Sequence, residues 1–151
     1  MSGTESLVHG TCIALGPRAA LLRGPPGAGK SDLALRFLAM YGGGSAKQAA
    51  ALISDDQTRL VVRGRELIAS APEAIKGQLE VRGVGIVDVA TRAEAVLAIV
   101  VDLVVGDEIE RLPADPGPRE EILGILVPVF KLGPFEASAA VKLKLAFDRV
   151  L

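Results

Sequence analysis

The chain has 151 residues, a formal net charge of −1 and 50% hydrophobic residues, with only 3% aromatic residues and no tryptophan. The balanced charge gives no electrostatic indication of binding to nucleic acid or to an anionic membrane. We therefore expect no nucleic-acid partner and no membrane partner, and a single domain over residues 1–151 with a mainly aliphatic core.

The single cysteine, Cys12, excludes an intrachain disulfide and suits a reducing compartment. The N-terminus lacks the basic and apolar regions of a signal peptide. The longest apolar run, near residues 98–105, is interrupted by Asp102 and is too short to cross a bilayer. We therefore expect a cytoplasmic protein.

Short apolar runs separated by Gly, Pro and Asp corners predict mostly strands. The expected strands lie at residues 7–15, 19–23, 50–54, 58–63, 79–82, 86–89, 97–105 and 125–132, and the expected helices at 30–41 and 136–150. On the first helix Leu33, Phe37 and either Met40 or Tyr41 recur at helical spacing, which predicts an apolar face. This order predicts an α/β fold with a mixed β-sheet and flanking helices.

Residues 24–31 form a complete G-x-x-x-x-G-K-S motif between an expected strand and an expected helix, which is the context that a phosphate-binding loop requires. Glycines let successive backbone N–H groups converge on a phosphate, and the helix N-terminus adds positive potential. Lys30 is expected to reach the terminal phosphates, and the Ser31 hydroxyl is expected to ligate Mg²⁺. The expected nucleotide or polyphosphate site comprises Gly24, Pro25, Pro26, Gly27, Ala28, Gly29, Lys30 and Ser31.

Asp55 and Asp56 follow the apolar run 51–53, at a strand end of the kind where α/β sheets bind ligands. Adjacent residues of an extended chain point to opposite faces, so one carboxylate can serve a metal and the other an incoming hydroxyl. An ordinary Asp-Asp turn explains the pattern equally well.

Three further positions admit two interpretations each. Glu80 shares one strand face with Arg82, which suits either Mg²⁺ and phosphate or, as the pattern alone favours, a surface ion pair. His9, the only histidine in the sequence, can either contact a phosphate or cap the edge of a sheet. Arg111 lies in a charged, proline-bearing loop, where its guanidinium can either bind an anion or simply be solvated.

Together these positions resemble the catalytic domain of the HPr kinase/phosphorylase family, bacterial enzymes that phosphorylate a serine of the phosphocarrier protein HPr. The chain is most similar to the short alphaproteobacterial form, which lacks an N-terminal regulatory domain. The resemblance rests on His9-Gly10, the loop 24–31, Ser54-Asp55-Asp56, Glu110-Arg111-Leu112 and above all Glu80-Val81-Arg82-Gly83-Val84-Gly85-Ile86-Val87-Asp88-Val89.

The resemblance implies a P-loop-containing mixed sheet and a role for each residue. Asp55 would take the proton from the attacking seryl hydroxyl, while Ser31 and Glu80 would hold Mg²⁺ with Asp56 near the metal. The groups implied to contact the transferred phosphoryl group are His9, Lys30 and Arg111. Positioning, charge neutralisation and proton transfer are what phosphoryl transfer requires.

The resemblance also implies ATP and Mg²⁺ as cofactors, and an HPr-like phosphocarrier of the nitrogen-type phosphotransferase system as partner. It further implies a homo-oligomer, because members of the family form hexamers. Residues 134–139 are acidic where the family carries a basic segment linked to dephosphorylation, so phosphorolysis of the phosphorylated carrier stays open.

The sequence is compatible with two other functions. A P-loop kinase or NTPase acting on a small molecule would explain the loop 24–31 but not the string 80–89. A catalytically silent nucleotide-binding sensor would not need Lys30, Ser31, Asp55 and Glu80 together.

Overall fold

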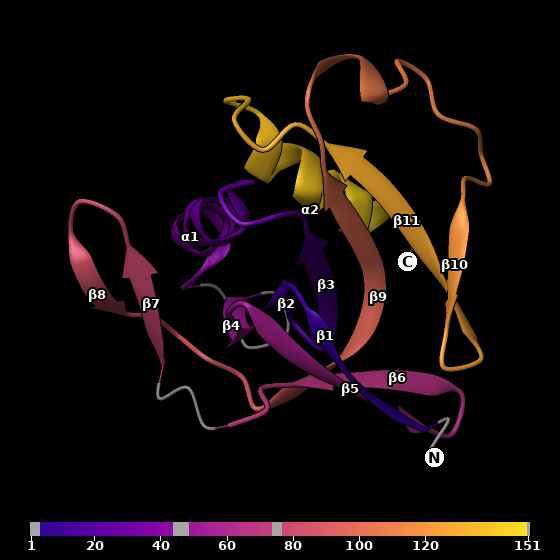
Figure 1. The fold of residues 1–151 in the computed structure, drawn as a ribbon, viewed down its shortest axis with the longest axis horizontal. Helices are drawn as coiled ribbons and strands as arrows, with labels where there is room; N and C mark the ends of the chain where they lie inside the picture. Colours follow the sequence, from indigo (N-terminus) through magenta and orange to yellow (C-terminus); the bar gives the residue numbers. More distant parts are fainter. Residues whose placement is uncertain (1–3, 44–48, 74–76, 151) are drawn as a thin grey trace.

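The computed structural model describes residues 4–43, 49–73 and 77–150. A curled mixed β-sheet carries the helices α1 (Lys30–Tyr41) and α2 (Ala139–Arg149), which pack against each other beside it (Figure 1). The predicted α/β class, a mixed sheet with flanking helices, is confirmed. No helix of the described ranges is long and apolar enough to cross a bilayer.

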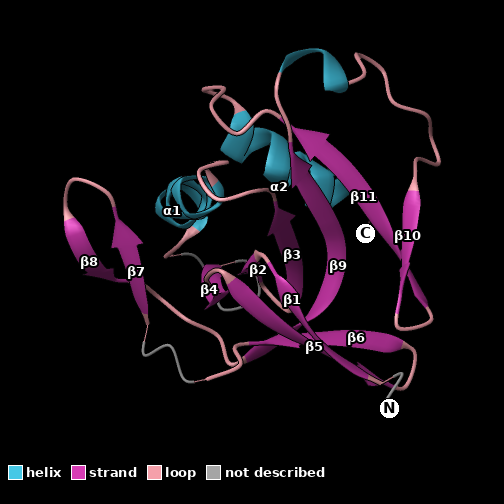
Figure 2. Cartoon of the chain, viewed as in Figure 1, coloured by secondary structure: helices cyan, strands magenta, loops and turns pink. Residues whose placement is uncertain are grey.

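Within the described ranges the main sheet has nine strands in the order β1-β5-β6-β9-β3-β2-β4, with β11 beside β9 and β10 beside β11 (Figure 2). Its strands are β1 (Glu5–His9), β2 (Thr11–Leu15), β3 (Arg18–Arg23), β4 (Ala50–Ser54), β5 (Gln57–Arg63), β6 (Glu66–Ser70), β9 (Glu94–Leu103), β10 (Arg119–Ile122) and β11 (Ile125–Leu132). A separate hairpin joins β7 (Gln78–Val81) to β8 (Gly85–Asp88).

The long strand β9 organises the sheet. It runs parallel to β3 along one edge, while its other edge pairs with β6 near its start and with β11 near its end. The ends of β3, β9 and β11 therefore lie side by side, and the segments that follow these strands emerge together.

Both faces of the central strands of the sheet are buried. Along β3, Ala20 and Leu22 pack toward α1 and α2, whereas Ala19 and Leu21 pack into a second cluster between the sheet and its curled-over strands. A strand that is buried on both faces has a continuous apolar sequence, as residues 19–22 have.

Helix α1 has the residue range predicted from the sequence. Leu33 and Phe37 are fully buried, and the Phe37 ring centroid lies 4.8 Å from that of Tyr41 and 5.9 Å from that of Phe147 in α2. Met40 is 53% exposed, so Tyr41 rather than Met40 completes the apolar face.

Other elements differ from the prediction. The strand predicted at residues 7–15 is two strands, because the chain changes partner at Gly10, where a Cβ would lie 2.7 Å from Leu21 Cδ1. The strands β6 and β10 were not predicted. The helix predicted over 136–150 begins only at Ala139, because residues 134–138 form a turn between β11 and α2.

Candidate functional site

The glycine-rich loop, residues 24–31, leaves the end of β3 and enters α1. Gly29 caps the helix at φ 95°, in the left-handed region that favours glycine, and the Ala28 N–H donates to the Pro25 carbonyl at 3.0 Å. A Cβ at Gly24 would lie 2.8 Å from the Ala28 Cβ, so the closed loop needs glycine there. The loop thus ends at a helix N-terminus, a position suited to an anion.

The Lys30 ammonium is held against this loop. Its Nζ donates to the Gly24 carbonyl at 2.6 Å and to the Pro25 carbonyl at 3.1 Å. The charge therefore lies over the loop backbone rather than out in solvent.

Ser31, Asp55 and Thr11 come together from three separate segments. Asp55 Oδ1 accepts hydrogen bonds from Ser31 Oγ and from Thr11 Oγ1, both at 2.8 Å. Thr11 is fully buried, and Asp55 follows β4, which pairs with the strand that carries Thr11. Among the described residues none donates to Asp55 Oδ2, whereas two hydrogen bonds fix Oδ1.

Asp56 has different surroundings from its neighbour. It adopts φ 70° and is exposed, while its backbone N–H donates to Thr11 Oγ1 at 3.3 Å and its carbonyl accepts from the Gly10 N–H at 2.9 Å. The left-handed turn at Asp56 therefore separates the two carboxylates, with Asp55 directed to the loop and Asp56 to the surface.

The remaining candidate residues lie at exposed positions. His9 ends β1 opposite Gln57, Glu80 lies on β7, and Arg111 lies in the segment between residues 109 and 118. Within the described ranges, no hydrogen bond or ion pair joins any of these three to the Ser31–Asp55 pair. The hairpin that carries Glu80 is anchored by buried Leu79 and lies beside α1 (Figure 1).

The described part of the chain holds no cluster of three or more His, Cys, Asp or Glu side chains arranged for a metal ion. Mg²⁺ commonly binds through one or two carboxylates together with substrate phosphates and waters. The Ser31 hydroxyl fits that kind of site, because it is a hard oxygen donor next to the loop and the neighbouring Asp55 carboxylate adds negative charge.

Sequence reasoning missed two features beside the loop. Thr11 is a polar residue at the start of an otherwise apolar strand. This contrast could have indicated that its buried hydroxyl has a hydrogen-bond partner, which is Asp55. Arg23, directly before the loop, donates to Asp102 at 2.7 Å and to Glu120 at 2.8 Å. The hydrogen bond from Arg23 lowers the pKa of Glu120, and the two carboxylates raise the pKa of Arg23. This network fixes the strand ends from which the loop departs.

A glycine-rich loop between a strand and a helix N-terminus, with a lysine over the loop and a serine bound to an aspartate, is typical of α/β domains that bind phosphorylated ligands. The family model of the HPr Serine kinase C-terminal domain matches residues 2–138. The chain belongs to this family, as its sequence resemblance predicted.

Similar proteins agree with this assignment. The HPr kinase/phosphorylase of Limosilactobacillus reuteri is 32% identical over 85 residues, which cover 56% of this chain and 24% of the relative. The HPr kinase/phosphorylase of Lactobacillus delbrueckii subsp. bulgaricus is 31% identical over 107 residues, which cover 66% of this chain and 31% of that relative. The matched region spans about a quarter to a third of the length of these relatives.

A solved structure shows the same fold. The HPr(Ser) kinase/phosphatase from Coxiella burnetii superposes with a TM-score of 0.75 at 24% identity, covering 95% of this chain and 89% of that chain. The predicted fold, similar to an HPr kinase catalytic domain, is therefore confirmed.

Proposed function

We propose that this chain binds ATP at the glycine-rich loop and transfers the γ-phosphoryl group to a serine of an HPr-like phosphocarrier protein. Membership of the family supports the reaction class. The observation that carries the proposal is the contact between Ser31 Oγ and Asp55 Oδ1 at 2.8 Å, which places a carboxylate at the loop where the phosphates would bind.

In this reaction Asp55 acts as general base through Oδ2, since Oδ1 is occupied by Ser31 and Thr11. The acceptor serine hydroxyl forms a bond to the γ-phosphorus, the bond between that phosphorus and the β–γ bridging oxygen breaks, and ADP leaves. The hydroxyl proton passes to Asp55. Lys30 stays over the loop and offsets the negative charge on the transferred group.

Ser31 would hold Mg²⁺ beside the loop, with Glu80 and Asp56 as further ligands, which leaves Asp55 Oδ2 for proton transfer. When bound, the ion supplies charge neutralisation for the phosphates. We also propose that His9 and Arg111 contact the phosphoryl group in the complex with substrate. Because all four of these additional residues are exposed, they are accessible to a docking protein. A homo-oligomer, a hexamer by family resemblance, is part of the same proposal.

The test is a phosphorylation assay with purified chain, MgATP and an HPr-like phosphocarrier from the same organism. Label transfer from γ-labelled ATP to the phosphocarrier supports the proposal. Labelling of small acceptors, or ATP hydrolysis that the phosphocarrier does not change, would favour the P-loop kinase or NTPase for small molecules. ATP binding without any turnover would favour the silent sensor. Adding inorganic phosphate to the phosphorylated carrier then tests phosphorolysis.

A second prediction concerns Thr11, which we propose positions Asp55. Replacing Thr11 by Val removes one of the two donors to Oδ1 while preserving the shape of the side chain. A hydrogen bond to a charged group contributes about 1.5–3 kcal/mol, so we expect kcat to fall roughly tenfold or more. The KM for ATP should change by no more than about twofold, since Ser31 and Lys30 remain.

Thr11→Ser is the matched control, because it keeps the hydroxyl and loses only a methyl group. It should restore most of the transfer rate. Equal losses in both variants would show that packing, and not the hydrogen bond to Asp55, explains the effect.

A further inference from the structure

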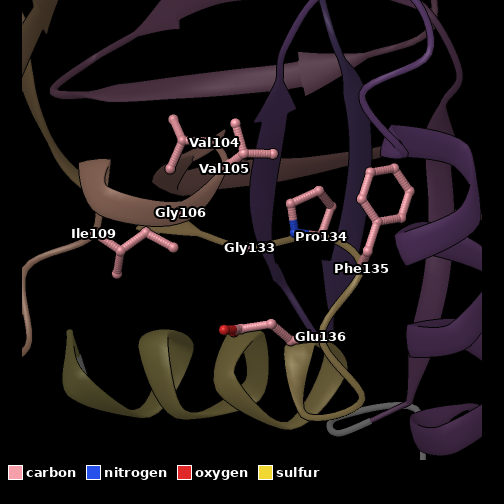
Figure 3. A pocket seen from close by; sticks show the side chains of 8 residues that line it. All are labelled: Val104, Val105, Gly106, Ile109, Gly133, Pro134, Phe135 and Glu136. Atoms are coloured by element: carbon pink, nitrogen blue, oxygen red, sulfur yellow. The ribbon is translucent and has the colours of Figure 1, made fainter.

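A cleft of about 320 Å³ opens next to the glycine-rich loop. The segment after β9 and the turn after β11 line it, and Figure 3 shows their side chains around a common gap. The side chains that form its walls are Val104, Val105, Ile109, Pro134, Phe135 and Glu136. We propose that this cleft binds the purine base of the nucleotide, an inference that rests on the proposed function.

The position of the cleft follows from the order of the strands. β3 leads into the loop, and β4, which Asp55 follows directly, lies on one side of it beyond β2. β9 and β11, whose ends lead into the cleft, lie on the other side. A nucleotide with its terminal phosphate between Lys30 and Asp55 therefore extends its nucleoside away from Asp55, toward the cleft.

The cleft and the loop are in direct contact. A Cβ built on Gly29 would lie 3.1 Å from the Phe135 ring and 3.3 Å from the Pro134 Cβ. A Cβ built on Gly24 would lie 3.6 Å from Leu103, the residue at which β9 ends. Phosphates held by the loop thus lie within the length of a nucleotide of the cleft wall.

The wall is anchored to the same helix that begins at the loop. Arg36 of α1 donates to the carbonyl of Glu136 at 3.2 Å and to the carbonyl of Pro134. On the opposite side the Val104 N–H donates to the Leu132 carbonyl at 3.0 Å. Phe135 therefore lies on a turn whose backbone is tied to α1, which preorganises its ring beside the loop.

The chemistry of the lining suits a flat heteroaromatic ring. Phe135 and Val105 are 67% and 68% exposed, so apolar surface is open to a ligand. Aromatic side chains stack on nucleobases, and binding clefts combine apolar walls with few polar groups. The polar side chain here is Glu136, whose Oε1 accepts from Lys142 Nζ at 2.7 Å. A carboxylate at this place can accept a hydrogen bond from a ring amino group.

The test compares ATP with inorganic tripolyphosphate, which carries the phosphates without a base. Dissociation constants for both are measured by calorimetry with the wild-type chain and with Phe135→Ala. Stacking on an aromatic side chain stabilises a bound base, so we expect Phe135→Ala to weaken ATP binding roughly tenfold. Tripolyphosphate binding should change by no more than about twofold. Leu126→Ala, at an apolar position 59% exposed on β11, is the matched control and should change neither ligand.

The outcomes separate the two proposals. If the wild-type chain binds neither ligand, the proposed function is wrong and the base site with it. If Phe135→Ala leaves ATP binding unchanged, or weakens both ligands equally, the base site is wrong while the phosphate site stands.

A second readout uses the absence of tryptophan from the chain. Phe135→Trp keeps an aromatic ring in the cleft and makes it the sole indole fluorophore. ATP should change its emission and tripolyphosphate should not. An indole that responds identically to both ligands would overturn the proposal.

Discussion

Replacing Asp55 by Asn is expected to lower phosphoryl transfer to the phosphocarrier by about 100- to 10,000-fold, the usual contribution of a general base. Asn has the same shape, and its side-chain oxygen can still accept from Ser31 and Thr11. It cannot take up the proton of the acceptor hydroxyl. ATP binding should therefore stay within about threefold of wild type, while the rate of label transfer collapses.

Asp148→Asn is the control for this experiment, because Asp148 is an exposed carboxylate paired with Lys144 on α2. It should transfer label at the wild-type rate. Transfer by Asp55→Asn at more than about a tenth of the wild-type rate would contradict the role of Asp55 as base. A parallel loss of ATP binding would instead assign Asp55 to nucleotide binding.

Replacing Phe37 by Ala is expected to have the largest effect on stability, a loss of about 3–5 kcal/mol in the free energy of unfolding. Phe37 is fully buried in α1 and packs its ring, tilted, against the rings of Tyr41 and Phe147. Its removal leaves a cavity between the two helices and the sheet. In a chain of this size the loss corresponds to a decrease in Tm on the order of 10 °C.

Met40→Ala on the same helix is the matched control, since Met40 is 53% exposed. Its unfolding free energy should stay within about 0.5 kcal/mol of wild type. Chemical denaturation of the three proteins measures both values. Equal stability of Phe37→Ala and Met40→Ala would show that the contact between α1 and α2 is not part of the stabilising core.

The loop and α1 were predictable because their signals are local. The motif at 24–31 predicts a strand before it, a turn within it and a helix start at its end. The observed helix has the predicted bounds. The continuous apolar run of β3 likewise follows from burial on both faces of a sheet.

The contacts that build the site were less accessible to sequence reasoning. The hydrogen bond between Thr11 and Asp55 joins residues 44 apart, and it depends on β2 pairing with β4. The split at Gly10 depends on how closely β3 approaches, which no local pattern encodes. The cleft beside the loop needs the ends of β9 and β11 side by side, and a parallel pairing leaves no short-range signal.

The measurement we would make first is phosphosite mapping of the HPr-like phosphocarrier after incubation with the chain and MgATP. We expect a single phosphoserine on the phosphocarrier, formed together with one ADP for each phosphoserine and absent with Asp55→Asn. ADP release without phosphoserine, or phosphoserine formed equally by wild type and Asp55→Asn, would contradict serine phosphorylation through Asp55.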